Sequence, residues 1–229
     1  VIDILDTRTI LLNNSVIHEC NQVVTDMLTM SNRAVLEVNN NFCAGSVVMN
    51  QSRLVIGPTR LGSAYIGNLL VKSAYARENL GDYTVQNNAN LSVDKIEMTA
   101  GTFASFGTQD KTAGTVKAKT VKLKDFIAGE YTSFICNTFV NTGKATLYNS
   151  GRLLINGNDA EKDIEIEGTL NNVYLGDYET EEKEYALIGC GPTVDINLNG
   201  SFTRASENVK LSFGKMNSEV DVAENVILQ

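Results

Sequence analysis

Apolar and polar residues alternate with a period of two through most of this 229-residue chain. The alternation is cleanest over 91–98 (LSVDKIEM), 115–123 (TVKAKTVKL) and 193–198 (TVDINL). This period places successive side chains on opposite sides of a β-strand. Apart from 16–30, no long stretch repeats its apolar residues at the helical period of 3.6. We therefore expect an all-β protein, with helix in less than about a tenth of its residues.

Turn-forming residues separate these short strands. The chain holds 25 asparagines and 18 glycines, in clusters such as Asn39-Asn40-Asn41, Asn87-Asn88 and Asn149-Ser150-Gly151. Asn and Gly tolerate left-handed backbone conformations, so each cluster predicts a tight turn. About twelve or more short strands with such turns fit either a pair of β-sandwich domains or a solenoid.

A recurring phrase favours the solenoid. A short apolar strand, an Asn or Gly, and another short apolar strand follow one another in 138–158 (TFVNTGKATLYNSGRLLINGN), where Asn141, Asn149 and Asn156 fall seven or eight residues apart. Three such sides make a coil of roughly 20–25 residues, inside the range of solenoid repeats. We predict one parallel β-solenoid domain over residues 1–229, with 12–30 as the candidate N-terminal cap.

Stacked coils place Val, Ile and Leu of successive strands in register inside the column. The alternation predicts ten core residues: Val116, Val121, Leu123, Leu147, Leu154, Ile164, Ile166, Ile196, Leu198 and Leu211.

The segments NTGKATLYNSGRLLINGN (141–158) and IEIEGTLNNVYLG (164–176) resemble the right-handed parallel β-helix of bacterial surface adhesins and autotransporter passengers. The resemblance is one of composition, extends over about residues 30–229 and includes no diagnostic motif. It implies a right-handed, elongated, non-enzymatic module that is exported to the cell surface or the extracellular space. It implies no functional residues.

Charge and hydropathy exclude some function classes. The net charge is −8, and an acidic surface repels the phosphates of nucleic acids. The single basic cluster (Lys117, Lys119, Lys122 and Lys124) alternates along one strand and has acidic residues nearby. The chain has no run of about 18 apolar residues, so we expect no membrane insertion. If the natural protein is exported, its export signal is outside this chain.

Catalytic candidates are few. His18 is the single histidine and lies beside Glu19 and Cys20, but neighbouring residues of a strand point to opposite faces, and a nucleophile and its base must face one another. Asp163, Glu165 and Glu167 should share the solvent side of one strand, and a second acidic run covers 177–184. These carboxylates are solvated surface, a calcium site or the acids of a glycoside hydrolase. The first interpretation is favoured, and no other cofactor is expected.

Tyrosine and cysteine give two further hypotheses. Exposed tyrosines stack on sugars, but the eight here are scattered along the sequence: Tyr65, Tyr75, Tyr83, Tyr131, Tyr148, Tyr174, Tyr178 and Tyr185. The four cysteines (Cys20, Cys43, Cys136 and Cys190) form no CxxC pair, which argues against zinc. Buried free thiols are favoured. A disulfide between Cys20 and Cys43 is the alternative, because their separation is close to one coil.

These observations favour a structural or adhesive surface module of a bacterial exported protein. We expect it to bind a host or cell-surface protein or a glycan through an extended solenoid face, without enzymatic activity. A polysaccharide-active β-helix enzyme, either a lyase or a glycoside hydrolase, is the alternative. Such enzymes build sites from residues of several coils, which a single sequence does not reveal.

Overall fold

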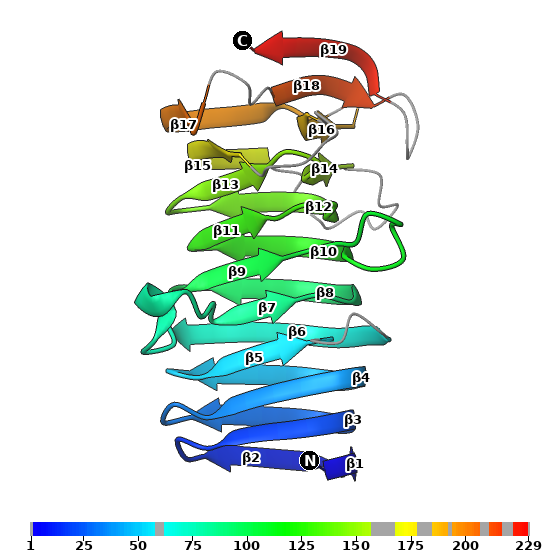
Figure 1. The fold of residues 1–229 in the computed structure, drawn as a ribbon, viewed down its shortest axis with the longest axis vertical. Helices are drawn as coiled ribbons and strands as arrows, with labels where there is room; N and C mark the ends of the chain where they lie inside the picture. Colours follow the sequence, from blue (N-terminus) through cyan, green and yellow to red (C-terminus); the bar gives the residue numbers. More distant parts are fainter. Residues whose placement is uncertain are drawn as a thin grey trace.

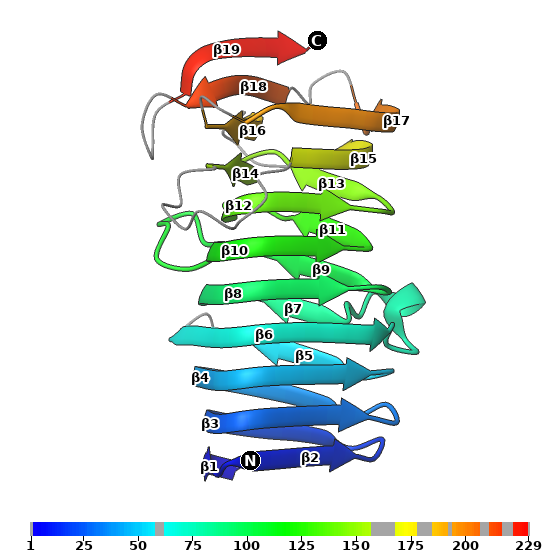
Figure 2. The same ribbon diagram turned by 180° about the vertical axis from the view of Figure 1, so that it is seen from behind.

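The computed structural model describes residues 2–57, 62–156, 168–177, 185–191, 194–206, 211–216 and 222–228. Their strands join a single sheet that coils as a right-handed parallel β-solenoid, as predicted. Figures 1 and 2 show the coils stacked in one column, with the N-terminus at one end. Helix is limited to the 3-10 turn η1 (Glu78–Leu80) in the described part of the chain. No described helix is long and apolar enough to cross a membrane.

Each coil has a front face and a longer back wall. The front face, nearest the viewer in Figure 1, contains β5 (Arg53–Ile56), β7 (Val85–Asn87), β9 (Thr102–Ser105), β11 (Asp125–Ala128) and β13 (Ala145–Tyr148). The back wall, nearest the viewer in Figure 2, contains β1 (Ile2–Asp6), β2 (Thr9–Asn13), β6 (Ser63–Ser73), β8 (Asn90–Met98), β10 (Thr115–Leu123), β12 (Ser133–Asn141), β14 (Arg152–Ile155), β16 (Ala186–Cys190) and β18 (Leu211–Met216). Four strands contribute to both: β3 (Ile17–Ser31), β4 (Val35–Asn50), β15 (Gly168–Gly176) and β17 (Ile196–Arg204). The last strand is β19 (Val222–Leu228).

The register between strands gives the length of each coil. Ile17 pairs with Val35, and Val35 pairs with Arg53, so the shortest coils take 18 residues. Leu153 pairs with Ile188, 35 residues later. The expected 20–25 residues therefore lie between the two extremes. Longer coils carry insertions that leave a corner of the column, as the segment with η1 does in Figure 1, and the register resumes after the insertion.

Three corners close each coil. The first corner leads from the front face to the back wall, the second lies within the back wall, and the third leads back to the front face. Left-handed backbone conformations at the first and third corners include Asn32, Gln51 and Ser150, with φ of 52°, 53° and 67°. Asn149-Ser150-Gly151 is a corner, as predicted. Asn39-Asn40-Asn41 is not: it lies inside β4, where the register with β3 shifts by one residue.

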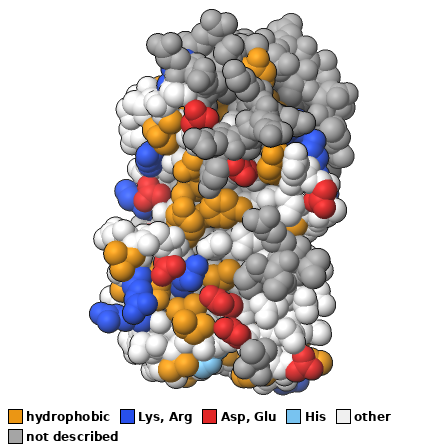
Figure 3. Space-filling view, viewed as in Figure 1, with side chains coloured by type: hydrophobic (Ala, Val, Ile, Leu, Met, Phe, Trp, Pro, Cys, Tyr) orange, Lys and Arg blue, Asp and Glu red, His pale blue; other side chains and the backbone are white. Residues whose placement is uncertain are grey.

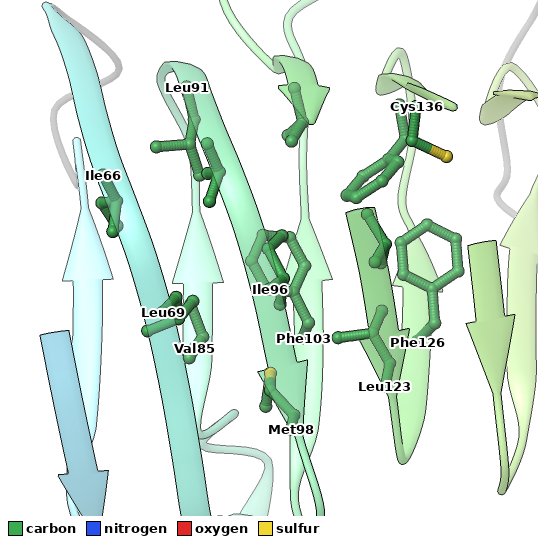
Figure 4. Packing of buried hydrophobic residues seen from close by; sticks show 14 of the residues in the cluster. Ile66, Leu69, Val85, Leu91, Ile96, Met98, Phe103, Leu123, Phe126 and Cys136 are labelled. Atoms are coloured by element: carbon green, nitrogen blue, oxygen red, sulfur yellow. The ribbon is translucent and has the colours of Figure 1, made fainter. Parts of the chain in front are cut away.

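The core fills the inside of the column from end to end. One continuous cluster includes residues from β2 to β18, and Figure 4 shows part of it, from Ile66 to Cys136. Phenylalanine rings pack edge to face in its upper half, where Phe126 lies 5.0 Å from both Phe134 and Phe139. Such aromatic pairs add about 0.5–1.5 kcal/mol each beyond the burial of their area.

Most of the predicted core residues that can be judged are buried. Five are at most 1% exposed and belong to the main cluster: Val116, Val121, Leu123, Leu147 and Leu211. Ile196 is half-buried against that cluster, and Ile164 and Ile166 lie outside the described residues. Leu154 is buried, but in a separate outer cluster with Leu187.

The prediction for Leu198 is wrong, because this side chain is 42% exposed. Leu198 pairs with Leu170, which is fully buried. It therefore occupies a core column, but the described chain places no further strand beyond β17 to cover it.

The two ends of the column differ. Segment 12–30, the candidate cap, lies mostly in β3, which pairs with β1 and β2 on one side and with β4 on the other. The terminal strands are therefore β1 and β2, and they expose Ile4 and Leu11. At the other end, β19 pairs with β18 in the only antiparallel pairing of the described strands. An antiparallel strand occupies the edge that another coil would use.

The cysteines are all free. Cys20 and Cys136 are buried in the core, as expected, but Cys43 is exposed. Cys43 pairs with Val24 and not with Cys20, so a disulfide between Cys20 and Cys43 is excluded by the register. Burial raises the pKa of the Cys20 and Cys136 thiols above the ordinary value.

Candidate binding face

The acidic residues that the sequence nominates, Asp163, Glu165 and Glu167, lie outside the described residues. Calcium binding by them therefore stays a prediction. Of the second acidic run, Asp177 is described, and its carboxylate accepts a hydrogen bond from the Ser206 hydroxyl at 2.8 Å. Among the described residues, no three His, Cys, Asp or Glu side chains gather as metal ligands would.

His18 does not join a catalytic group in the described structure. It lies half-buried in β3, and its Nε2 is 3.1 Å from the Asn14 side-chain oxygen. Cys20 lies two residues further along the same strand and is fully buried in the core. A thiol held there is out of reach of a substrate and is mainly protonated, because burial raises its pKa.

The outer side of the front face changes character along the column. Outward positions of successive coils stack in the order Glu37, Val55, Gln86, Ala104, Ile127, Thr146 and Tyr174. The column therefore runs from charged and polar residues to small, hydroxylated and aromatic ones. Figure 3 shows hydrophobic side chains gathered in the middle of this face, with charged side chains around them.

A hollow of about 380 Å³ lies over β11, β13 and β15 on this face. We call it the front hollow. Its floor includes Ile127 and Thr146, and its walls include Tyr148, Tyr174 and Lys144. The two tyrosines come from successive coils, because Thr146 pairs with Tyr174 and Tyr148 pairs with Gly176.

A glycine determines where the Tyr148 ring lies. A methyl group added to Gly176 would come within 2.2 Å of the Tyr148 ring, well inside van der Waals contact. The ring therefore lies flat over the backbone of the next coil and is half-buried. This packing holds an aromatic surface in place at the wall of the hollow.

Tyr174 is held by a cation. The Lys144 ammonium lies 4.0 Å from the centre of the Tyr174 ring, a cation–π contact worth about 0.5–1 kcal/mol at an exposed site. The backbone N–H of Lys144 also donates to the Asp125 carboxylate at 2.6 Å. The ring, the ammonium and the carboxylate are thus fixed relative to one another before any ligand arrives.

This set of groups suits binding better than turnover. Aromatic rings take the apolar faces of sugars, and an ammonium and a carboxylate hydrogen-bond to hydroxyl groups. Glycoside hydrolysis needs two carboxylic acids about 5–9 Å apart, and Asp125 is the single carboxylate among the described residues that line the hollow.

Comparison with protein families, with curated proteins and with solved structures finds no match to this chain.

Sequence reasoning treated the tyrosines as scattered. The coil that joins Thr146 to Tyr174 is 28 residues long, longer than any regular period in the sequence. The signal that could have found the site is the YxxxG spacing that aligns aromatic and glycine positions, and it becomes visible only when the register is known.

Proposed function

We propose that this chain is a non-enzymatic structural and adhesive surface module of an exported bacterial protein, which binds an extended ligand through its front face. The column of coils supports a rigid spacer and display surface. Neighbouring coils lie about 4.8 Å apart, so an extended chain that follows the column meets equivalent positions on successive coils.

One observation carries the proposal: Tyr148 and Tyr174 present their rings on successive coils of the same hollow. A glycan is the ligand class that fits best, because its sugar rings offer alternating apolar faces and hydroxyl groups. Lys144 at the rim favours a glycan that carries carboxylate or other anionic groups, which also offsets repulsion by the net charge of −8.

The test is retardation of the purified protein in native gels that contain acidic or neutral polysaccharides. Replacing both Tyr148 and Tyr174 with Ala should weaken binding at least about tenfold, since each ring contributes roughly 1 kcal/mol of apolar contact. Tyr65→Ala is the matched control, because Tyr65 is 43% exposed on the back wall. Its retardation should equal that of the unchanged protein.

The same samples are assayed for new reducing ends and unsaturated products. Turnover that disappears when Asp163, Glu165 or Glu167 is changed to Ala would replace this proposal with the lyase or hydrolase alternative. Retardation that survives loss of both tyrosines would also contradict it.

A further inference from the structure

A second hollow, of about 200 Å³, lies at the first corner beside β10, β12 and β14. We call it the corner hollow. Its lining is cationic and hydroxylated: Lys111, Thr115, Tyr131, Ser133, Ser150 and Arg152. No carboxylate lines it within the described residues, although the chain as a whole carries eight net negative charges.

Strand register builds one wall of the corner hollow. Thr115 pairs with Ser133, and Ser133 pairs with Arg152. Their outward side chains therefore stack along the column at the coil spacing of about 4.8 Å. Two hydroxyl groups and a guanidinium thus point from the same side of three successive coils.

The loop that carries Lys111 closes the hollow and is held by its own hydrogen bonds. The Lys111 backbone N–H donates to the Thr108 carbonyl at 2.8 Å, and the Thr108 hydroxyl accepts from the Ala113 N–H at 3.1 Å. The Asp110 carboxylate accepts from the Thr112 hydroxyl at 2.8 Å and from the Thr112 N–H at 3.1 Å. This nearest acid is occupied by Thr112, and no described ion pair involves Lys111.

The wall of the corner hollow is costly to the folded chain. Lys111, Tyr131 and Ser150 have φ of 58°, 52° and 67°, a left-handed conformation that costs a side-chain-bearing residue about 1 kcal/mol. Ser150 is 5% exposed, and its hydroxyl is buried without a hydrogen-bond partner. An unsatisfied buried hydroxyl costs roughly another 1–3 kcal/mol. Strain and an unpartnered group beside two cations are features that accompany ligand sites.

We propose that the corner hollow binds a tetrahedral oxyanion, phosphate or sulfate, either as the free ion or as an ester on a sugar. Lys111 and Arg152 supply the charge, and Thr115 and Ser133 donate hydrogen bonds to the remaining oxygens. Turning the Ser150 hydroxyl about its Cα–Cβ bond gives it the partner that it lacks. The site is separate from the front hollow, and the inference does not depend on the proposed function.

The test is calorimetric titration of the full chain with inorganic phosphate, inorganic sulfate, glucose 6-phosphate and glucose, at constant ionic strength set with chloride. We expect saturable binding of one anion per chain and none of glucose. Tighter binding of glucose 6-phosphate than of phosphate assigns the ligand as an ester, and the reverse order assigns it as the free ion.

Three variants separate a built site from a general attraction of anions. Changing Lys111 and Arg152 together to Gln should weaken binding at least about tenfold, since each removes a charge-assisted hydrogen bond. Ser133→Ala, which keeps every charge, should weaken it roughly threefold. The matched control changes the exposed Lys122 and Lys124 to Gln and should bind within about twofold of the unchanged protein.

Thermal unfolding of each variant confirms that it is folded. The proposal is overturned if the unchanged protein shows no saturable binding of any of the three anions. It is equally overturned if the Lys122 and Lys124 control loses as much affinity as the Lys111 and Arg152 variant.

Discussion

Leu153 and Leu154 are adjacent in β14 but face opposite sides of the wall. Leu153 is fully buried in the main core, whereas Leu154 packs with Leu187 and Ile135 in a small outer cluster. Leu153→Ala should lower the free energy of unfolding by about 2–5 kcal/mol, because it leaves a cavity inside the column. Leu154→Ala should cost less, about 1–2 kcal/mol, because the outer cluster collapses more easily. Urea denaturation of both variants measures the difference, and equal losses would contradict this assignment of sides.

The cysteines should differ sharply in reactivity. Cys43 is exposed, whereas Cys136 is buried and its pKa is raised by that burial. A thiol reagent at pH about 8 should therefore modify Cys43 in a fast phase that Cys43→Ser removes. Because the folded pKa of Cys136 is raised, deprotonation favours the unfolded chain as pH rises above about 8.5. Fast modification of the folded Cys43→Ser variant would contradict the buried placement of the other thiols.

Single residues also show what the sequence can and cannot predict. Alternation assigned Val116, Val121 and Leu123 to the core correctly, because the period of two is a local property. The same argument failed for Leu198, whose burial depends on a further coil above it. Outward-facing partners such as Tyr148 and Tyr174 were missed for the same reason, since register is a long-range property.

At the scale of elements, the second corner depends on close contact between coils. A methyl group on Gly67 would lie 2.4 Å from the Gly45 carbonyl oxygen of the coil below. Backbone atoms cannot move aside as a flexible side chain can, so Gly67→Ala should cost about 3 kcal/mol or more.

The control for that prediction is Gly81→Ala. Gly81 has φ of 95° and no atom within 4 Å of an added methyl group, so the change should cost only about 1 kcal/mol of backbone strain. Denaturation in urea compares the two variants. A Gly67→Ala protein no less stable than Gly81→Ala would show that the coils do not approach as closely as described.

Corners were harder to predict than strands. Asn149-Ser150-Gly151 forms a corner, whereas Asn39-Asn40-Asn41 forms a register shift inside β4. Both clusters tolerate left-handed or irregular backbone, and the choice between a turn and a bulge depends on the strand alongside. Arg33 and Lys111 adopt left-handed conformations that their residue types do not favour, so composition gave no signal for these corners.

At the scale of the whole molecule, the fold class followed from one global property, the dominance of period-two alternation with Asn and Gly turns. A parallel column satisfies that pattern, because each strand buries one side against the strands across the coil. The candidate site did not follow in the same way. The front hollow draws Asp125, Lys144, Tyr148 and Tyr174 from three coils, and no local motif joins them.

The central claim is that ligand binds along the front face. Hydroxyl-radical footprinting, with a retarding polysaccharide as ligand, measures this directly because tyrosine side chains are oxidised where they are accessible. Tyr148 and Tyr174 of the front hollow should become protected, whereas Tyr65, exposed on the back wall, should be oxidised at an unchanged rate. Protection of Tyr65 without protection of Tyr148 and Tyr174 would contradict the account.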